Sequence, residues 1–164
     1  MFELMMMRFS DNLGSYAHNV QYIMMSQVNM SSYFTQLLDW FPNLEGMSLP
    51  KCNIRSMDGI DKCRRLRIID LHDNHLTTIS PDILYLKNTL IGLALGGCDI
   101  FELPDFFTEL TNLRYLYLDN LPLENLPEDI GKLSELTLLR CRDCCFRSLP
   151  DSIKNLNVHH TNIC

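Results

Sequence analysis

A chain of 164 residues has room for one domain, and 46% hydrophobic against 21% charged residues is too apolar a composition for an intrinsically disordered protein. The 20 acidic and 14 basic residues give a formal net charge of -6, which argues against nucleic acid as a partner. No apolar run approaches the roughly 18 residues that span a membrane, so no membrane partner is expected. The seven cysteines cannot all pair with one another, so we expect a reducing, intracellular compartment, the cytoplasm.

The first 19 residues stand apart from the rest of the chain. They are rich in Met, and their apolar stretch Phe2–Met7 is too short for a signal peptide and has no basic lead-in. We expect residues 1–19 to form a cap-like helical segment that covers the open face of the domain that follows, residues 20–164.

Residues 20–164 repeat a pattern of eleven positions. Positions one, four, six and eleven are apolar, and position nine is typically Asn or Cys. The copies start at residues 20, 44, 66, 90, 113 and 136, so the spacings are 24, 22, 24, 23 and 23 residues. A regular period of this length indicates a stacked repeat protein. The six copies cover Val20–Met30, Leu44–Ile54, Leu66–Leu76, Leu90–Ile100, Leu113–Leu123 and Leu136–Phe146.

A second phrase recurs between the later copies, as in Leu126-Pro127-Glu128-Asp129-Ile130 and Leu149-Pro150-Asp151-Ser152-Ile153, with a shorter form at Leu103-Pro104-Asp105. Together the two patterns resemble the leucine-rich repeat family over residues 20 to about 164. The Leu-Pro-x-x-Ile phrase is similar to that of intracellular Ras-group repeats and plant nucleotide-binding immune receptors. Cys at position nine and the phrase Leu113-Arg114-Tyr115-Leu116 favour the immune-receptor type. The resemblance implies a protein-protein interaction module that acts as a recognition or regulatory component in immune or signalling pathways.

Physical chemistry predicts the same architecture. The apolar-x-apolar alternation at positions four to six gives a strand of only a few residues, and position nine turns the chain away from it. Asn74 at that position can satisfy buried backbone groups, and a Pro after a Leu suits the first turn of a short helix. One repeat cannot bury its apolar side alone, so neighbours stack. We therefore expect an α/β solenoid, an arc with a short-strand parallel sheet on its concave side and helical or irregular segments on its convex side.

The end of the chain fits two registers. A copy over Ile153–Ile163 satisfies the pattern but starts only 17 residues after Leu136. In the alternative register, Ile153 and Leu156 belong to the convex segment. Neither register provides a polar cap, so a second hypothesis is a structural subunit that packs, or associates with itself, through its open repeat ends.

The pattern also predicts which side chains face outward from the concave sheet, namely those at positions three, five, seven and eight. The fourth copy is nearly bare there, with Gly92, Ala94, Gly96 and Gly97. It should form a trough between two ridges of larger side chains, which suits a protein-binding site because exposed Tyr and Arg are enriched at interfaces. The predicted partner-binding residues are Asp70, His72 and Asp73 on one ridge and Tyr115, Tyr117, Asp119, Arg140 and Arg142 on the other.

Two groups of residues raise the possibility of metal binding or catalysis. Cys141-x-x-Cys144 is followed by His159, His160 and Cys164, but the repeat pattern already accounts for Cys141 at position six and Cys144 at position nine. Neighbouring arginines could lower the pKa of the Cys141 thiol, yet no His is placed to act as its base.

Asp70 and His72 could share a proton, but no third partner is near in the sequence. We therefore expect no metal, no cofactor and no enzymatic activity.

Charge is unevenly distributed. Residues 51–67 hold six of the 14 basic side chains, most of them on the convex side or its edge. Residues 99–135 carry nine acidic side chains and only Arg114 and Lys132 as basic ones. Such an arc can orient a charged partner or stack head to tail.

Overall fold

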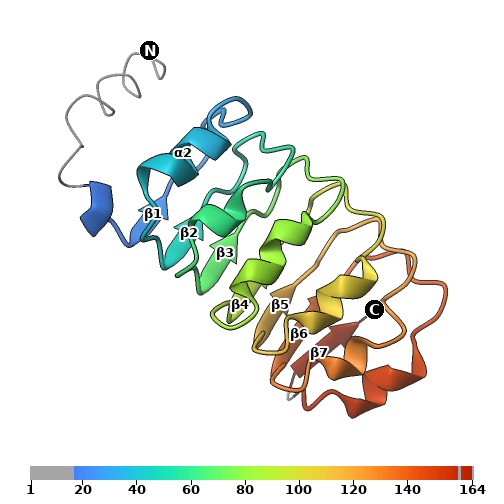
Figure 1. Ribbon diagram of the computed structural model, residues 1–164. Helices are drawn as coiled ribbons and strands as arrows, with labels where there is room; N and C mark the ends of the chain where they lie inside the picture. The colour runs from blue at the N-terminus through green and yellow to red at the C-terminus, as the bar shows by residue number, and fades with distance from the viewer. Residues whose placement is uncertain (1–16, 159, 164) are drawn as a thin grey trace.

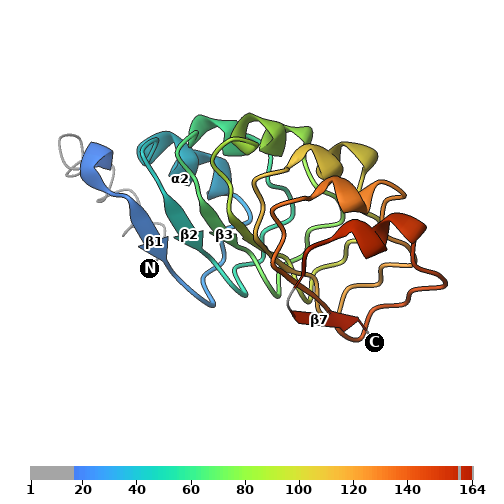
Figure 2. The ribbon, with the colours of Figure 1, turned by 90° about the horizontal axis from the view of Figure 1, so that it is seen from below.

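A single parallel sheet of seven strands runs through the computed structural model, which describes residues 17–158 and 160–163 (Figure 1). The strands follow one another in the sheet in chain order, and Figure 2 shows them on the inner side of an arc whose outer side carries the helices. The predicted leucine-rich repeat solenoid is therefore confirmed. The strands are β1 (Tyr22–Met24), β2 (Gly46–Ser48), β3 (Ile68–Asp70), β4 (Gly92–Ala94), β5 (Tyr115–Tyr117), β6 (Leu138–Cys141) and β7 (His160–Ile163).

Short helices carry the chain back along the convex side. Within the described residues, α2 (Phe34–Trp40) is the one α-helix, and the others are 3-10 helices. Pro81 opens one of them after Ser80, whose hydroxyl accepts a hydrogen bond from the Asp82 N–H. The 3-10 helices are η1 (Ala17–Asn19), η2 (Ile60–Lys62), η3 (Pro81–Leu86), η4 (Asp105–Glu109), η5 (Ile130–Lys132) and η6 (Asp151–Asn155).

The pairing register follows the eleven-position pattern. Gly46, Ile68 and Gly92, all at position three, lie opposite one another on consecutive strands. Because side chains alternate along a strand, this register places every position-four residue on the core side. The position-one leucines are correspondingly buried, each no more than 1% exposed: Leu44, Leu66, Leu90, Leu113 and Leu136.

The structure decides between the two registers at the end of the chain. Ile153 lies on η6, and His160 pairs with Leu138. Position one of the last copy is therefore Val158, 22 residues after Leu136. The register that starts at Ile153 is wrong, because 17 residues are too few for a strand, its turn and the convex return.

Two features bear on the expectations for the chain ends and for membranes. Of the cap segment expected over residues 1–19, residues 1–16 lie outside the described residues, and Ala17–Asn19 forms η1. None of the helices in the described part of the chain is long and apolar enough to cross a membrane.

Candidate functional site

The concave face has a hollow of about 460 Å³ where strands β3 to β6 end. Of the four small residues predicted to form a trough, Ala94 and Gly96 line the floor of the hollow, whereas Gly92 and Gly97 do not. Six of the eight predicted partner-binding residues line it, whereas Tyr115 and Arg142 do not. Asn120 is a further lining residue that the sequence reasoning did not select. The six predicted lining residues are Asp70, His72, Asp73, Tyr117, Asp119 and Arg140.

The floor is bare because the backbone leaves no room for side chains. A Cβ atom on Gly96 would lie 2.8 Å from the Asp119 carbonyl oxygen, which is too close for any other residue. Gly97 has a φ of +69°, and a Cβ atom there would overlap the Asp73 carboxylate. These two glycines keep the hollow open between the third and fifth repeats.

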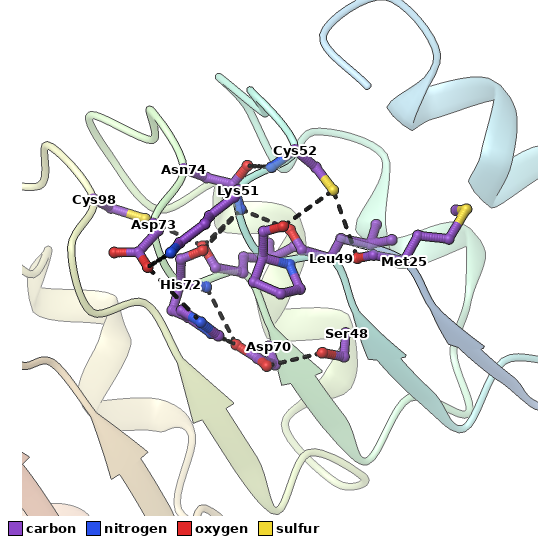
Figure 3. Close-up of polar contacts among 12 residues, drawn as sticks. Met25, Ser48, Leu49, Lys51, Cys52, Asp70, His72, Asp73, Asn74 and Cys98 are labelled. Carbon is purple, nitrogen blue, oxygen red and sulfur yellow. Dashed lines mark hydrogen bonds and ion pairs between the residues drawn. The ribbon is translucent and has the colours of Figure 1, made fainter. Parts of the chain in front are cut away.

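One wall of the hollow is a chain of polar side chains that contact one another (Figure 3). The His72 Nδ1 atom lies 2.6 Å from Asp70 Oδ1, and the Ser48 hydroxyl donates to Asp70 Oδ2 at 2.9 Å. On the other side of the ring, His72 Nε2 lies 3.9 Å from Asp73 Oδ2, and Lys51 Nζ lies 3.7 Å from that same oxygen. Contacts with carboxylates on both sides hold the imidazole in one orientation at the rim.

The opposite wall is built around Arg140. Its guanidinium lies 2.6 Å from Asp119 Oδ2 and 5.7 Å from the centre of the Tyr117 ring. The Arg142 backbone N–H donates to the other Asp119 oxygen at 2.9 Å, so both carboxylate oxygens are engaged. The Nε atom of Arg140 is buried and has no hydrogen-bond partner among the residues that the structure describes. This wall therefore keeps one unused hydrogen-bond donor beside an aromatic ring.

The sequence reasoning missed a backbone feature that aims two of these side chains. Position eight has a positive φ in all six copies, between 55° and 69°. Asp73 and Asn120 hold this conformation at the edges of the hollow. Asn, Asp and Gly are the residues that tolerate it best, and their recurrence at position eight is the signal that could have revealed it. The six residues are Gln27, Lys51, Asp73, Gly97, Asn120 and Asp143.

The cysteines are placed as core and turn residues. Cys141 is fully buried, and this burial raises the pKa of its thiol despite the adjacent arginines. Burial also raises the pKa of Cys144, whose thiol donates to the Leu118 carbonyl at 3.2 Å. Neither thiol is activated as a nucleophile. Groups of three or more His, Cys, Asp or Glu side chains able to hold a metal do not occur in the described part of the chain, which excludes His159 and Cys164.

The Asp70–His72 pair is likewise not arranged as a hydrolytic site. Ser48 donates to the carboxylate of Asp70 and not to the imidazole of His72. A nucleophilic serine needs the imidazole as its base, with the carboxylate behind it. In this structure the Ser48 hydroxyl contacts the Asp70 carboxylate, so the contacts orient these side chains without activating Ser48 as a nucleophile.

Comparisons with known proteins agree with the repeat architecture. A sequence model of the Leucine Rich Repeat family matches residues 65–86 and 112–133. A probable disease resistance protein of Arabidopsis thaliana is 33% identical over an alignment of 117 residues that covers 68% of this chain and 13% of that protein. The TMV resistance protein N of Nicotiana glutinosa is 29% identical over 147 residues, covering 77% of this chain and 13% of that protein.

A solved structure gives the same fold. The leucine-rich repeat ectodomain of the plant membrane receptor kinase GASSHO1/SCHENGEN3 from Arabidopsis thaliana, in complex with CASPARIAN STRIP INTEGRITY FACTOR 2, superposes with a TM-score of 0.70. The two are 21% identical, and the match covers 88% of this chain and 18% of the ectodomain. The two resistance proteins named above are much longer, and this chain spans only about an eighth of the length of each. The strand register, the matched repeats and these relatives show that the chain belongs to the leucine-rich repeat family, with repeats of the plant immune-receptor type.

Proposed function

We propose that this chain is a recognition module that binds a protein partner through the hollow on its concave face. The observation that carries the proposal is a floor of small residues between two walls of charged and aromatic side chains, with a partly exposed Arg140 beside Tyr117. Bound protein segments fill such hollows, and Tyr and Arg are the residues that most often dominate the binding energy.

The two walls suit different parts of a partner. The Arg140 side chain is 38% exposed, and a partner oxygen can accept from the exposed part of its guanidinium while one terminal nitrogen stays paired with Asp119. On the other wall, the Asp73 side chain is 45% exposed and can accept a hydrogen bond from the partner. The floor at Ala94 allows a partner backbone to come close to the sheet.

The relatives support an immune role for this recognition. Those with the best coverage are resistance proteins, and the superposed ectodomain was solved with a bound factor. We infer a recognition or regulatory component of an immune or signalling pathway that acts in the cytoplasm, without enzymatic activity. Residues 20–164 would form the recognition domain and residues 1–19 its cap.

The test is affinity purification of the tagged chain from its native cell lysate, with proteins identified by mass spectrometry. The double variant Tyr117→Ala/Arg140→Glu removes the aromatic ring and reverses the charge at the hollow. Its matched control is Tyr85→Ala/Arg64→Glu, because Arg64 lies 5.0 Å from the Tyr85 ring on the convex side. Circular dichroism and a thermal melt confirm that both variants fold.

A partner bound through the hollow should be recovered with the wild type and the control variant and reduced about 30-fold with the concave variant, the change expected when a hot spot is lost. A partner that the folded concave variant retains in full would contradict the proposal.

A further inference from the structure

A second and larger hollow lies at the edge of the arc where the strands begin. It has a volume of about 590 Å³ and is lined by position-two residues, among them Arg67, Ile91 and Arg114, together with residues from the preceding turns, among them Arg65. The concave hollow is built from positions five to eight, so the two surfaces lie at opposite ends of the strands. A partner could occupy either one without blocking the other.

The edge hollow holds unpaired positive charge. Its lining contains three arginines and two glutamates, and Arg114 pairs with Glu135 at 3.7 Å. Arg65 and Arg67 have no ion pair or side-chain hydrogen bond within the described residues. The Arg67 backbone is fully used in the sheet, where its N–H donates to the Glu45 carbonyl and its carbonyl accepts from two N–H groups of the next repeat. Glu45 of the lining is likewise without an ion pair among the described residues, so two guanidinium groups and one carboxylate of the hollow are free to bind a partner.

Two exposed apolar side chains follow residues of the edge hollow directly in the chain, Ile68 after Arg67 and Tyr115 after Arg114. Ile68 is 45% exposed and Tyr115 is 42% exposed at position three, next to the position-two arginines. Gly92 separates them, and a Cβ atom on it would lie 3.0 Å from Ile68 Cδ1. The glycine thus lets Ile68 lie along the sheet and join its apolar surface to Tyr115.

We propose that this edge binds a protein segment in which acidic and apolar side chains alternate, on a partner other than the one bound by the concave hollow. Carboxylates of the segment would pair with Arg65 and Arg67, since the guanidinium fork matches a carboxylate in two-pronged geometry. Its apolar side chains would cover Ile68, Ile91 and Tyr115. A nucleic acid fits less well, because the chain carries a net charge of -6 and the hollow only two unpaired cations.

Fluorescence anisotropy with defined peptides tests this proposal at 150 mM salt. The probe is a fluorescein-labelled peptide of six Glu-Leu pairs, and its matched control has six Lys-Leu pairs. Arg65→Glu/Arg67→Glu is the test variant, and Tyr85→Ala/Arg64→Glu is the control variant. The variant Tyr117→Ala/Arg140→Glu alters the concave hollow and shows whether the peptide binds there or at the edge hollow.

The Glu-Leu peptide should bind the wild type at least about tenfold more tightly than the Lys-Leu peptide does, and Arg65→Glu/Arg67→Glu should abolish that preference. The control and concave variants should bind as the wild type does. Equal binding by the folded Arg65→Glu/Arg67→Glu protein, or no binding to the wild type, would overturn the proposal. Light scattering of the protein alone tests whether a second copy of the chain occupies the edge hollow instead. Self-association of the wild type that is lost in Arg65→Glu/Arg67→Glu would overturn the proposal in favour of that second copy.

Discussion

Asn74 at position nine shows how one residue closes a repeat. Its side-chain oxygen accepts a hydrogen bond from the Cys52 N–H at 3.0 Å (Figure 3) and another from the Ile54 N–H at 2.9 Å. Its amide nitrogen donates to the carbonyls of Leu49 and Leu71, at 2.8 and 2.9 Å. Four buried backbone groups from two repeats therefore depend on one side chain. A cysteine at the same position offers less, because its thiol is a weak donor and a weak acceptor.

Replacing Asn74 with Ala should destabilise the fold strongly. The change leaves four backbone groups without partners in a site that is 2% exposed, and we expect the free energy of unfolding to fall by about 3 kcal/mol. Urea unfolding followed by circular dichroism measures the loss. Asn88→Ala, at an exposed site in the turn before β4, should change stability by less than about 0.5 kcal/mol. Equal effects of the two substitutions would show that the Asn74 bonds contribute nothing.

Cys63 and Cys145 should differ sharply in reactivity. Burial raises the pKa of Cys63 to about 12, with nearby Asp39 adding to the effect, and its thiol donates to the Phe41 carbonyl at 3.3 Å. At pH 8 only about one Cys63 in 10,000 would then be a thiolate, the form that reacts. Iodoacetamide followed by peptide mass spectrometry should show Cys145, which is exposed, modified in the native protein and Cys63 modified only after unfolding.

The same pKa shift gives a direction for stability against pH. Because the folded protein holds the Cys63 proton more tightly than the ordinary thiol value of 9.0, this contribution to stability is complete below pH 9 and declines as pH rises toward 12. Rapid modification of Cys63 in the native protein at pH 8 would contradict the burial on which both statements rest.

At the scale of the elements, the turn at position eight is what separates one strand from the next convex segment. A left-handed residue there ends each strand of β1 to β6 after three or four residues. Gly97 makes this turn in the fourth repeat, and because it has no Cβ atom it also leaves room for the Asp73 carboxylate. The turn thus links the fold of one repeat to the shape of the concave hollow.

Gly97→Ala should destabilise the protein by about 2 kcal/mol, because the left-handed conformation penalises a Cβ atom and the Asp73 carboxylate must move away. Thermal unfolding provides the measurement, with Thr77→Ala as the exposed control in a neighbouring repeat. A melting temperature for Gly97→Ala equal to that of the wild type would contradict this prediction, because the turn would then accommodate a Cβ atom without loss of stability.

The strands were predictable from the sequence, and the convex segments only in part. Apolar spacing fixes which residues face the core, and this is why the pattern placed position three of all six copies in register. The spacing says little about the convex side, where a Pro can open either an α-helix or a 3-10 helix. Among the convex segments that the structure describes, α2 is the single α-helix. The end of the chain was ambiguous because Ile153 and Leu156 satisfy both registers.

At the scale of the whole molecule, the arc brings together residues that are up to 70 positions apart in the sequence. Asp70 and Arg140 line one hollow because each strand is displaced from the last by a single sheet spacing (Figure 2). The sequence predicted this grouping, since equal positions in successive copies must stack. It did not predict the edge hollow, because Arg65 and its neighbours in the preceding turns lie outside the eleven-position pattern.

A protein partner in the concave hollow can be captured by site-specific photocrosslinking. Tyr117 is replaced by p-benzoylphenylalanine, one aromatic residue for another, so the shape of the wall is largely kept. The matched control places the same residue at Tyr85, which is 60% exposed on the convex side. Irradiation of both proteins in native lysate is followed by denaturing gel electrophoresis and mass spectrometry. The account predicts a crosslinked partner from position 117 and none of that identity from position 85. The same partner crosslinked equally from both positions, or from position 85 alone, would contradict it.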